Sequence, residues 1–237
     1  MKMEAIRFSV EGVLNSFRVP FFRTYHLSFL APPKTTIIGM LVNIMGRPEQ
    51  YFYEILKDNT LQVAVVIDEI KGKAKDLWAY KTYAGKNMGR SVIRRDRLFE
   101  ASYTIYLSSG ETGILKEIYQ ALEKPKAVPA LGMDDELIKI KNVEWISLSR
   151  NESMTINSVF MDRSYSYKAN VKDFSKPVEL PRSNVVPLSF RIKLDKQGRR
   201  ESRKPEEEYK QVEYINCEIA LDGVESFTDG RNRVVFY

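Results

Sequence analysis

Residues 61–107, LQVAVVIDEIKGKAKDLWAYKTYAGKNMGRSVIRRDRLFEASYTIYL, decide the fold. The stretch begins with an apolar segment (61–70) and ends with an alternating one (97–107), and both patterns predict β-strands. Between them, residues 71–97 hold nine Lys or Arg against two acids, with glycines at three positions. We therefore expect two core strands joined by a projecting, strongly basic hairpin.

This projection carries the excess positive charge of the chain. The whole chain has 37 basic and 31 acidic side chains, a net charge of +6, whereas residues 71–97 alone carry +7. Trp78, Tyr80 and Tyr83 lie among the cations. Cations attract phosphates and flat rings stack on bases, so the segment suits nucleic acid. A solvated, lysine-rich surface hairpin is the alternative.

The composition bounds the class of protein. A chain of 237 residues with 43% hydrophobic side chains fits one large domain or two small ones. No apolar run approaches the roughly 18 residues of a membrane span, and the N-terminal residues carry charges where a signal peptide is apolar. We expect a cytoplasmic protein that does not contact a membrane.

The same composition argues against metals and cofactors. Cys217 and His26 are the only cysteine and the only histidine, which excludes an internal disulfide and a four-ligand Cys/His zinc site. The acidic pair Asp134–Asp135 follows a glycine turn, and the run 206–208 lies in a charged segment. We expect no bound metal and no cofactor.

Residues 1–149 predict an α+β, ferredoxin-like (RRM-like) domain. Further strands are expected over 3–14 and 137–148, and helices from Thr35 or Thr36 to Gly46 and over 111–123. Apart from a short helix at 49–58, the order is βαββαβ, which gives an antiparallel sheet with both helices on one face. The other face stays free for a ligand or a second domain. The aromatic signature of an ordinary RRM is missing.

Residues 150–237 predict a smaller, mostly β part. Alternating apolar residues indicate short strands at 190–194, 211–221 and 233–237. The segment 195–208 is almost entirely charged and polar, so we expect it to form a mobile loop that buries too little to become ordered.

A run of turn and helix signals lies at residues 16–46, SFRVPFFRTYHLSFLAPPKTTIIGMLVNIMG. It contains an Arg-x-Pro turn at 18–20, Pro-Pro-Lys-Thr-Thr at 32–36, and an apolar helix with glycines at 39 and 46. The run resembles the N-terminal signature of the fifth CRISPR-associated (Cas) protein family, in the RAMP superfamily. IRRDRLFEASYTIYL (93–107) and VPALGMDDELIKI (128–140) resemble further parts of that family.

The resemblance implies a subunit of a type I CRISPR interference (Cascade-like) complex in antiviral defence. Such a subunit holds the 5′ handle of the guide RNA, contacts the repeated backbone subunit and the large subunit, and meets target DNA only indirectly. The family carries a projecting thumb between the second and third core strands, where residues 71–97 lie. The charge pattern and the resemblance indicate the same segment, which we call the thumb.

We expect RNA contacts from the thumb and from the loop before the first helix. Arg18 and Arg23 lie in that loop, and Lys34 lies beside a helix N-terminus, whose N–H groups favour phosphate. The alternative for Lys34 is a solvated cation beside a capping threonine. The thumb candidates are Lys81, Lys86, Arg90, Arg94, Arg95 and Arg97.

The role of His26 distinguishes two possible functions, RNA cleavage and non-catalytic RNA binding. One branch of the resembled family cleaves the guide precursor without metal, using a Tyr, a Lys and a His as acid and base. His26 and its neighbour Tyr25 are the candidates for that role. That branch, however, has its histidine downstream of the thumb, where this sequence has none. We therefore expect a non-catalytic RNA-binding subunit, in which His26 contacts a handle nucleotide or is structural. The rivals are a metal-independent endoribonuclease and an RRM-like adaptor unrelated to CRISPR.

Overall fold

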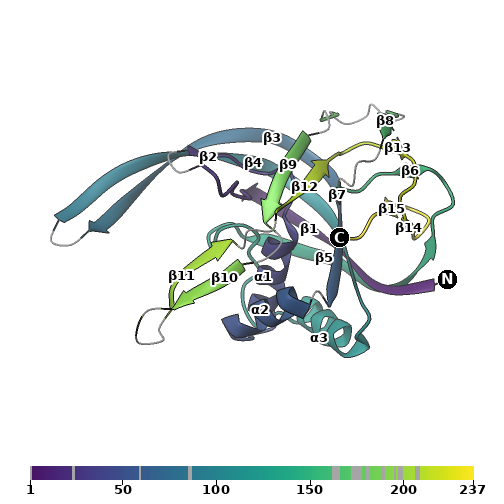
Figure 1. Cartoon of the computed structure of the whole chain (residues 1–237), viewed down its shortest axis with the longest axis horizontal. Coiled ribbons are helices and arrows are strands. Elements are labelled where there is room, and N and C mark those ends of the chain that lie inside the picture. Colours follow the sequence, from purple (N-terminus) through teal and green to yellow (C-terminus); the bar gives the residue numbers. More distant parts are fainter. Residues whose placement is uncertain are drawn as a thin grey trace.

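The computed structural model describes residues 2–22, 25–58, 60–84, 87–161, 166–171, 178–179, 182–187, 190–194, 196, 200–205 and 209–237. These residues form an α+β fold with a large curled sheet and helices gathered below it (Figure 1). The elements are β1 (Lys2–Asn15), β2 (Tyr25–His26), α1 (Lys34–Ile44), α2 (Glu49–Asp58), β3 (Leu61–Ala84), β4 (Asn87–Ser109), α3 (Thr112–Glu123), β5 (Ile138–Arg150), β6 (Thr155–Ile156), β7 (Phe160–Met161), β8 (Tyr167–Ala169), β9 (Arg182–Pro187), β10 (Phe190–Leu194), β11 (Arg200–Pro205), β12 (Tyr209–Tyr214), β13 (Ile219–Leu221), β14 (Phe227–Thr228) and β15 (Arg233–Val234).

The central sheet is built around β1. This strand pairs antiparallel with β4 on one side and β5 on the other, and β4 pairs antiparallel with β3. The resulting order is β5-β1-β4-β3. The α+β class and the expected core strands and helices are confirmed, and the ferredoxin-like assignment stays a prediction.

Helix α1 begins slightly earlier than the sequence predicted. Pro33, and not Thr35 or Thr36, is the N-cap, and no side chain caps the helix. The Pro33 carbonyl accepts hydrogen bonds from the N–H groups of Thr36 and Ile37, which makes a threonine cap unnecessary. Gly46 ends the helix as predicted, since its φ of +62° is a left-handed conformation that glycine adopts without strain.

One face of the sheet packs on the helices. The alternation along β1 places Ile6, Phe8 and Val10 in the same buried core cluster as Leu41 of α1 and Ile118 of α3. Figure 1 shows all three helices on this side of the sheet. The apolar faces of the core strands and of the amphipathic helices therefore form one core layer on this side of the sheet.

The other face is partly covered by the C-terminal segment. Tyr106 and Leu148 of the sheet share a buried cluster with Val234, against which Phe227 and Phe236 pack. β14 pairs with β5 at one edge of the sheet, while the backbone of Tyr237 exchanges two hydrogen bonds with Val63 of β3 at the other edge. The segment thus links β5 to β3, the first and last strands of the β5-β1-β4-β3 order.

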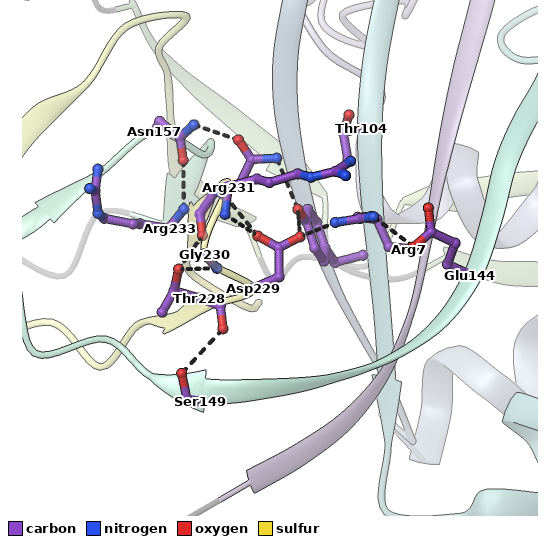
Figure 2. Close-up of polar contacts among 12 residues, drawn as sticks. Arg7, Thr104, Glu144, Ser149, Asn157, Thr228, Asp229, Gly230, Arg231 and Arg233 are labelled. Atoms are coloured by element: carbon purple, nitrogen blue, oxygen red, sulfur yellow. Dashed lines mark hydrogen bonds and ion pairs between the residues drawn. The ribbon is translucent and has the colours of Figure 1, made fainter.

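A polar network fastens this segment to the sheet (Figure 2). The Arg7 guanidinium donates to the carboxylates of Asp229 at 2.5 Å and Glu144 at 2.8 Å, and the Tyr106 hydroxyl donates to Asp229 at 2.9 Å. Burial opposes ionisation of Asp229, but hydrogen bonds from the Asn232 backbone, Arg7 and other donors outweigh it and lower the pKa of Asp229. The charged carboxylate is therefore the form that the fold stabilises.

The rest of the C-terminal part is mostly β, as expected, with two differences. The strand predicted at 211–221 is divided into β12 and β13, because the chain turns at residues 215–218, where the Asn216 side chain accepts the Glu179 N–H at 2.8 Å. The segment 195–208, expected as a loop, contains β11, which pairs with β10. Apart from β11 and Lys196, that segment lies outside the described residues.

Within the described part of the chain, none of the helices is both long and apolar enough for a membrane span.

Candidate nucleic-acid interface

The thumb is the outer part of the β3–β4 hairpin. The two strands continue beyond the core sheet as a ribbon that projects far from the body (Figure 1). The register pairs Lys81 with Arg90 and Leu77 with Arg94. The hairpin that the sequence predicted between the second and third core strands is therefore present.

The two faces of the ribbon differ. Side chains alternate along a strand, and directly opposed residues share a face. Lys81, Arg90 and Arg94 lie with Leu77 and Val92 on one face, and all five are exposed. We call this the exposed face. These solvent-exposed cationic and aliphatic side chains are available to contact a binding partner.

The opposite face is packed, and we call it the His26 face. β2 pairs in parallel with β4 and places His26 beside Arg95. Arg95 is 6% exposed, donates to Asp76 at 2.6 Å, and lies over the Trp78 ring at 5.0 Å. The His26 and Trp78 ring centroids are 6.3 Å apart. Trp78, which also neighbours Tyr80, is 36% exposed and forms the open side of this cluster.

The environment of His26 favours the neutral imidazole. Burial lowers its pKa below the usual value, and the positive charges of Arg18 and Arg95 lower it further. At neutral pH the ring therefore offers one hydrogen-bond donor and one acceptor, without a charge. Such a ring suits a base edge or a hydroxyl better than a phosphate.

Tyr25 does not join His26. It lies on the exposed face, where its ring is 4.5 Å from the Arg94 guanidinium carbon and its hydroxyl is 3.1 Å from the Asp96 carboxylate. Neighbouring strand residues point to opposite sides, so these two side chains are separated by the ribbon. The geometry does not bring the candidate acid and base together.

Arg97 is held at the foot of the thumb by a buried carboxylate. Its guanidinium lies 3.2 Å from Glu136 and 3.7 Å from Asp76, and it donates to the Leu14 carbonyl at 3.3 Å. The Glu136 side chain is fully buried and also accepts hydrogen bonds from the Ser16 N–H at 2.7 Å and hydroxyl at 2.6 Å. Arg97 thus lies in a structural network.

Gly132 completes this network. Its φ is +117°, and an added Cβ would lie 2.5 Å from the Ser16 carbonyl oxygen, so no other residue fits without a shift. Ser16, Arg97 and Gly132 come from the three sequence runs that carried the family resemblance. The structure brings those runs together at the base of the thumb.

The remaining candidates are dispersed. Arg18 is exposed and donates to the Phe22 carbonyl at 3.4 Å. Lys34 is only 8% exposed; its ammonium donates to the Tyr237 backbone oxygen at 3.3 Å, and burial lowers its pKa to about 8. Arg23 and Lys86 lie outside the described residues. All the candidate RNA contacts stay predictions.

The sequence reasoning missed Asp76 and Glu136 as organisers of the site. Asp76 was counted only as one of two acids in the thumb, and its pairing with Arg95 depends on the strand register. Glu136 lies 120 residues from Ser16, and no local pattern connects them.

Across the described ranges, no group of three or more potential metal ligands is close enough to hold an ion.

One comparison with known proteins identifies a family. The model of the CRISPR-associated protein (Cas_Cas5) family matches residues 5–168, more than half of the chain. A search of curated protein sequences gives no significant match.

Two solved structures share the fold at low sequence identity. A CRISPR protein from Archaeoglobus fulgidus is 13% identical, with 98% of each chain covered and a TM-score of 0.57. A chain described as a CRISPR RNA-guided surveillance complex is 15% identical, with 92% of this chain and 91% of that chain covered and a TM-score of 0.54. On the strength of the family match, this chain belongs to the Cas5 family of CRISPR-associated proteins.

Proposed function

We propose that this chain is a non-catalytic RNA-binding subunit of a type I CRISPR interference (Cascade-like) complex. It holds the 5′ handle of the guide RNA, contacts the repeated backbone subunit and the large subunit, and serves antiviral defence in the cytoplasm. Target DNA contacts it only indirectly. The observation that carries the proposal is the exposed face of the thumb, on which Lys81, Arg90 and Arg94 lie open to solvent in a member of this family.

The fold supports the same role. The strand order β5-β1-β4-β3 with helices on one side is the arrangement of a ferredoxin-like domain, which we propose for residues 1–149. One solved structure with a similar fold is described as an RNA-guided surveillance complex. We extend that role to this chain as part of the proposal.

The two faces of the thumb have different tasks in this proposal. Lys81, Arg90 and Arg94 bind phosphates through charge, independently of sequence. On the other face, Trp78 stacks on an unpaired base and the neutral His26 contacts a base edge or a 2′-hydroxyl, which is how single-stranded RNA is usually read. Arg95 and Arg97 act mainly as positioning residues, because acidic side chains already bind them.

The rival function is metal-independent cleavage of the guide precursor with His26 as acid or base. A general base and a general acid must both reach the reacting atoms. His26 has the neutral form that a base requires, but Tyr25 lies on the opposite face and hydrogen-bonds to Asp96. The separation of Tyr25 and His26 favours the non-catalytic role.

A cleavage assay separates these functions. Wild-type protein and His26→Ala are incubated with the repeat RNA of the host's own CRISPR array in EDTA, and binding and product length are both measured. We expect a stable complex and intact RNA for both proteins. Cleavage at one position by the wild type, lost in His26→Ala, would overturn the non-catalytic assignment, and absence of binding would overturn RNA binding itself.

A further inference from the structure

A second basic hairpin lies in the C-terminal part. Residues 190–205 contain seven Lys or Arg against two acids, whereas the other residues between 98 and 237 contain fourteen basic and twenty acidic side chains. The positive charge of this half of the chain is therefore concentrated in one short segment. Its net charge of +5 over 16 residues is denser than that of the thumb, which carries +7 over 27 residues.

The structure forms this segment into β10 and β11. They pair antiparallel, with Arg191 opposite Lys204, Lys193 opposite Ser202 and Arg203 opposite Ile192. In Figure 1 this hairpin and the thumb extend toward the same side of the molecule, at the left of the view. Two hairpins of strongly basic sequence therefore project on the same side of the molecule.

Two exposed aromatic rings that contact each other come from chain segments near the two hairpins. Tyr209 is the first residue of β12, directly after the segment that follows β11, and Phe21 lies in the loop that leads to β2 at the thumb. Their ring centroids are 5.3 Å apart with an interplanar angle of 54°. Phe21 is 51% exposed, Tyr209 is 37% exposed, and Phe22 beside them is also exposed.

These features fit one kind of ligand. A group of exposed apolar side chains commonly marks an interaction site, and aromatic rings near two basic hairpins suit bases whose phosphates follow the cations. A duplex hides its base faces within the stack, so the rings favour a single strand. A protein partner for the same surface would need a strongly acidic face to match both ribbons.

We propose that a single strand of RNA leaves the thumb, stacks on the Phe21–Tyr209 pair, and continues along the β10–β11 hairpin, which binds its phosphates. The inference rests on the proposed function, because it extends the RNA path that begins at the thumb. It adds a second phosphate-binding surface and an aromatic junction to that function.

The test measures how tightly RNA probes of two lengths bind to the wild-type protein and to variants with neutralised lysines and arginines. Oligouridine probes of about 8 and about 24 nucleotides represent a strand that occupies one element and a strand that spans both. The variant Arg191→Gln/Lys193→Gln/Arg203→Gln/Lys204→Gln neutralises the second hairpin. The control, Lys116→Gln/Lys124→Gln/Lys139→Gln/Lys168→Gln, removes the same charge from exposed positions elsewhere.

We expect the hairpin variant to weaken binding of the long probe at least about five-fold. The slope of log affinity against log salt concentration for that probe should decrease in magnitude by up to about 3. The short probe and the control variant should change less than about two-fold. Equal losses for both probes, equal losses for both variants, or no loss would contradict the second surface. Binding of single-stranded DNA of matching sequence with the same affinity and the same loss would contradict RNA as the occupant.

The aromatic junction has its own test. Tyr209→Ala should weaken binding of the long probe about five-fold or more, whereas Tyr209→Phe, which keeps the ring, should bind like the wild type. Loss of binding in the thumb variant Lys81→Ala/Arg90→Ala/Arg94→Ala, with no effect of the hairpin or Tyr209 variants, would leave the proposed function intact and overturn only this extension. No RNA binding by the wild type would overturn both.

Discussion

The two faces of the thumb carry the same residue types with different surroundings. Arg94 and Arg95 are neighbours in β4, yet Arg94 is exposed, whereas Arg95 is buried and bound to Asp76. The register of two long strands produces this difference, since each residue faces away from the next. A basic segment therefore combines cations that stabilise the fold with cations that remain available to a ligand.

The largest effect should come from the packed base of the thumb. Replacing Arg97 by Ala leaves the Glu136 carboxylate buried without its cation, so the free energy of unfolding should fall by about 3–5 kcal/mol. Chemical denaturation, followed by circular dichroism, measures this change. Arg90→Ala, on the exposed face, is the control and should change stability by less than about 0.5 kcal/mol. Similar losses in both variants would show that the two faces do not differ in this way.

An intermediate effect should come from the open side of the His26 cluster. Trp78→Ala removes a ring that can stack on a base, so RNA affinity should fall by about 1–3 kcal/mol. Trp78→Phe retains an aromatic ring and should recover much of the affinity. Fluorescence anisotropy with labelled repeat RNA provides the measurement. If Trp78→Ala binds RNA as tightly as the wild type, base contacts must be sought elsewhere.

The smallest effect should appear in the pH dependence of stability. Burial, followed by the charges of Arg18 and Arg95, lowers the pKa of His26 in the folded protein, so the unfolded chain binds the proton more readily. Stability should therefore decrease as the pH falls through about 6.5, the ordinary value for histidine. His26→Gln should flatten that part of the profile measured by thermal unfolding. An unchanged profile in the variant would mean that His26 is not the group responsible.

The sequence predicted the core elements well because their signals are local. The alternation along β1 and β4, the amphipathic pattern of α3 and the glycine at position 46 each depend on neighbouring residues only. The start of α1 was placed late because the Pro33 carbonyl begins the helix without a side-chain cap. The strand predicted at 233–237 is shorter in the structure, where β15 spans only Arg233–Val234. The two-residue strand β14 and the pairing of Tyr237 with β3 were missed, since neither leaves a local pattern in the sequence.

The site was predictable only in outline. Charge density located the thumb, but the division between its faces required the register that pairs Asp76 with Arg95 and the parallel pairing that brings in His26. Lys34 illustrates the limit of composition: a cation beside a helix N-terminus suggests a phosphate site, yet the structure buries it against the Tyr237 backbone. Long-range contacts decide which cations remain exposed.

The salt dependence of RNA binding tests the central claim most directly. Lys81→Ala/Arg90→Ala/Arg94→Ala is compared with Lys116→Ala/Lys124→Ala/Lys139→Ala, three exposed lysines outside the thumb, using repeat RNA over a series of salt concentrations. The exposed-face variant should bind more weakly at low salt and lose about 2 from the slope of log affinity against log salt, whereas the control keeps the wild-type slope. A wild-type affinity and slope in the exposed-face variant would contradict the assignment of RNA binding to this surface.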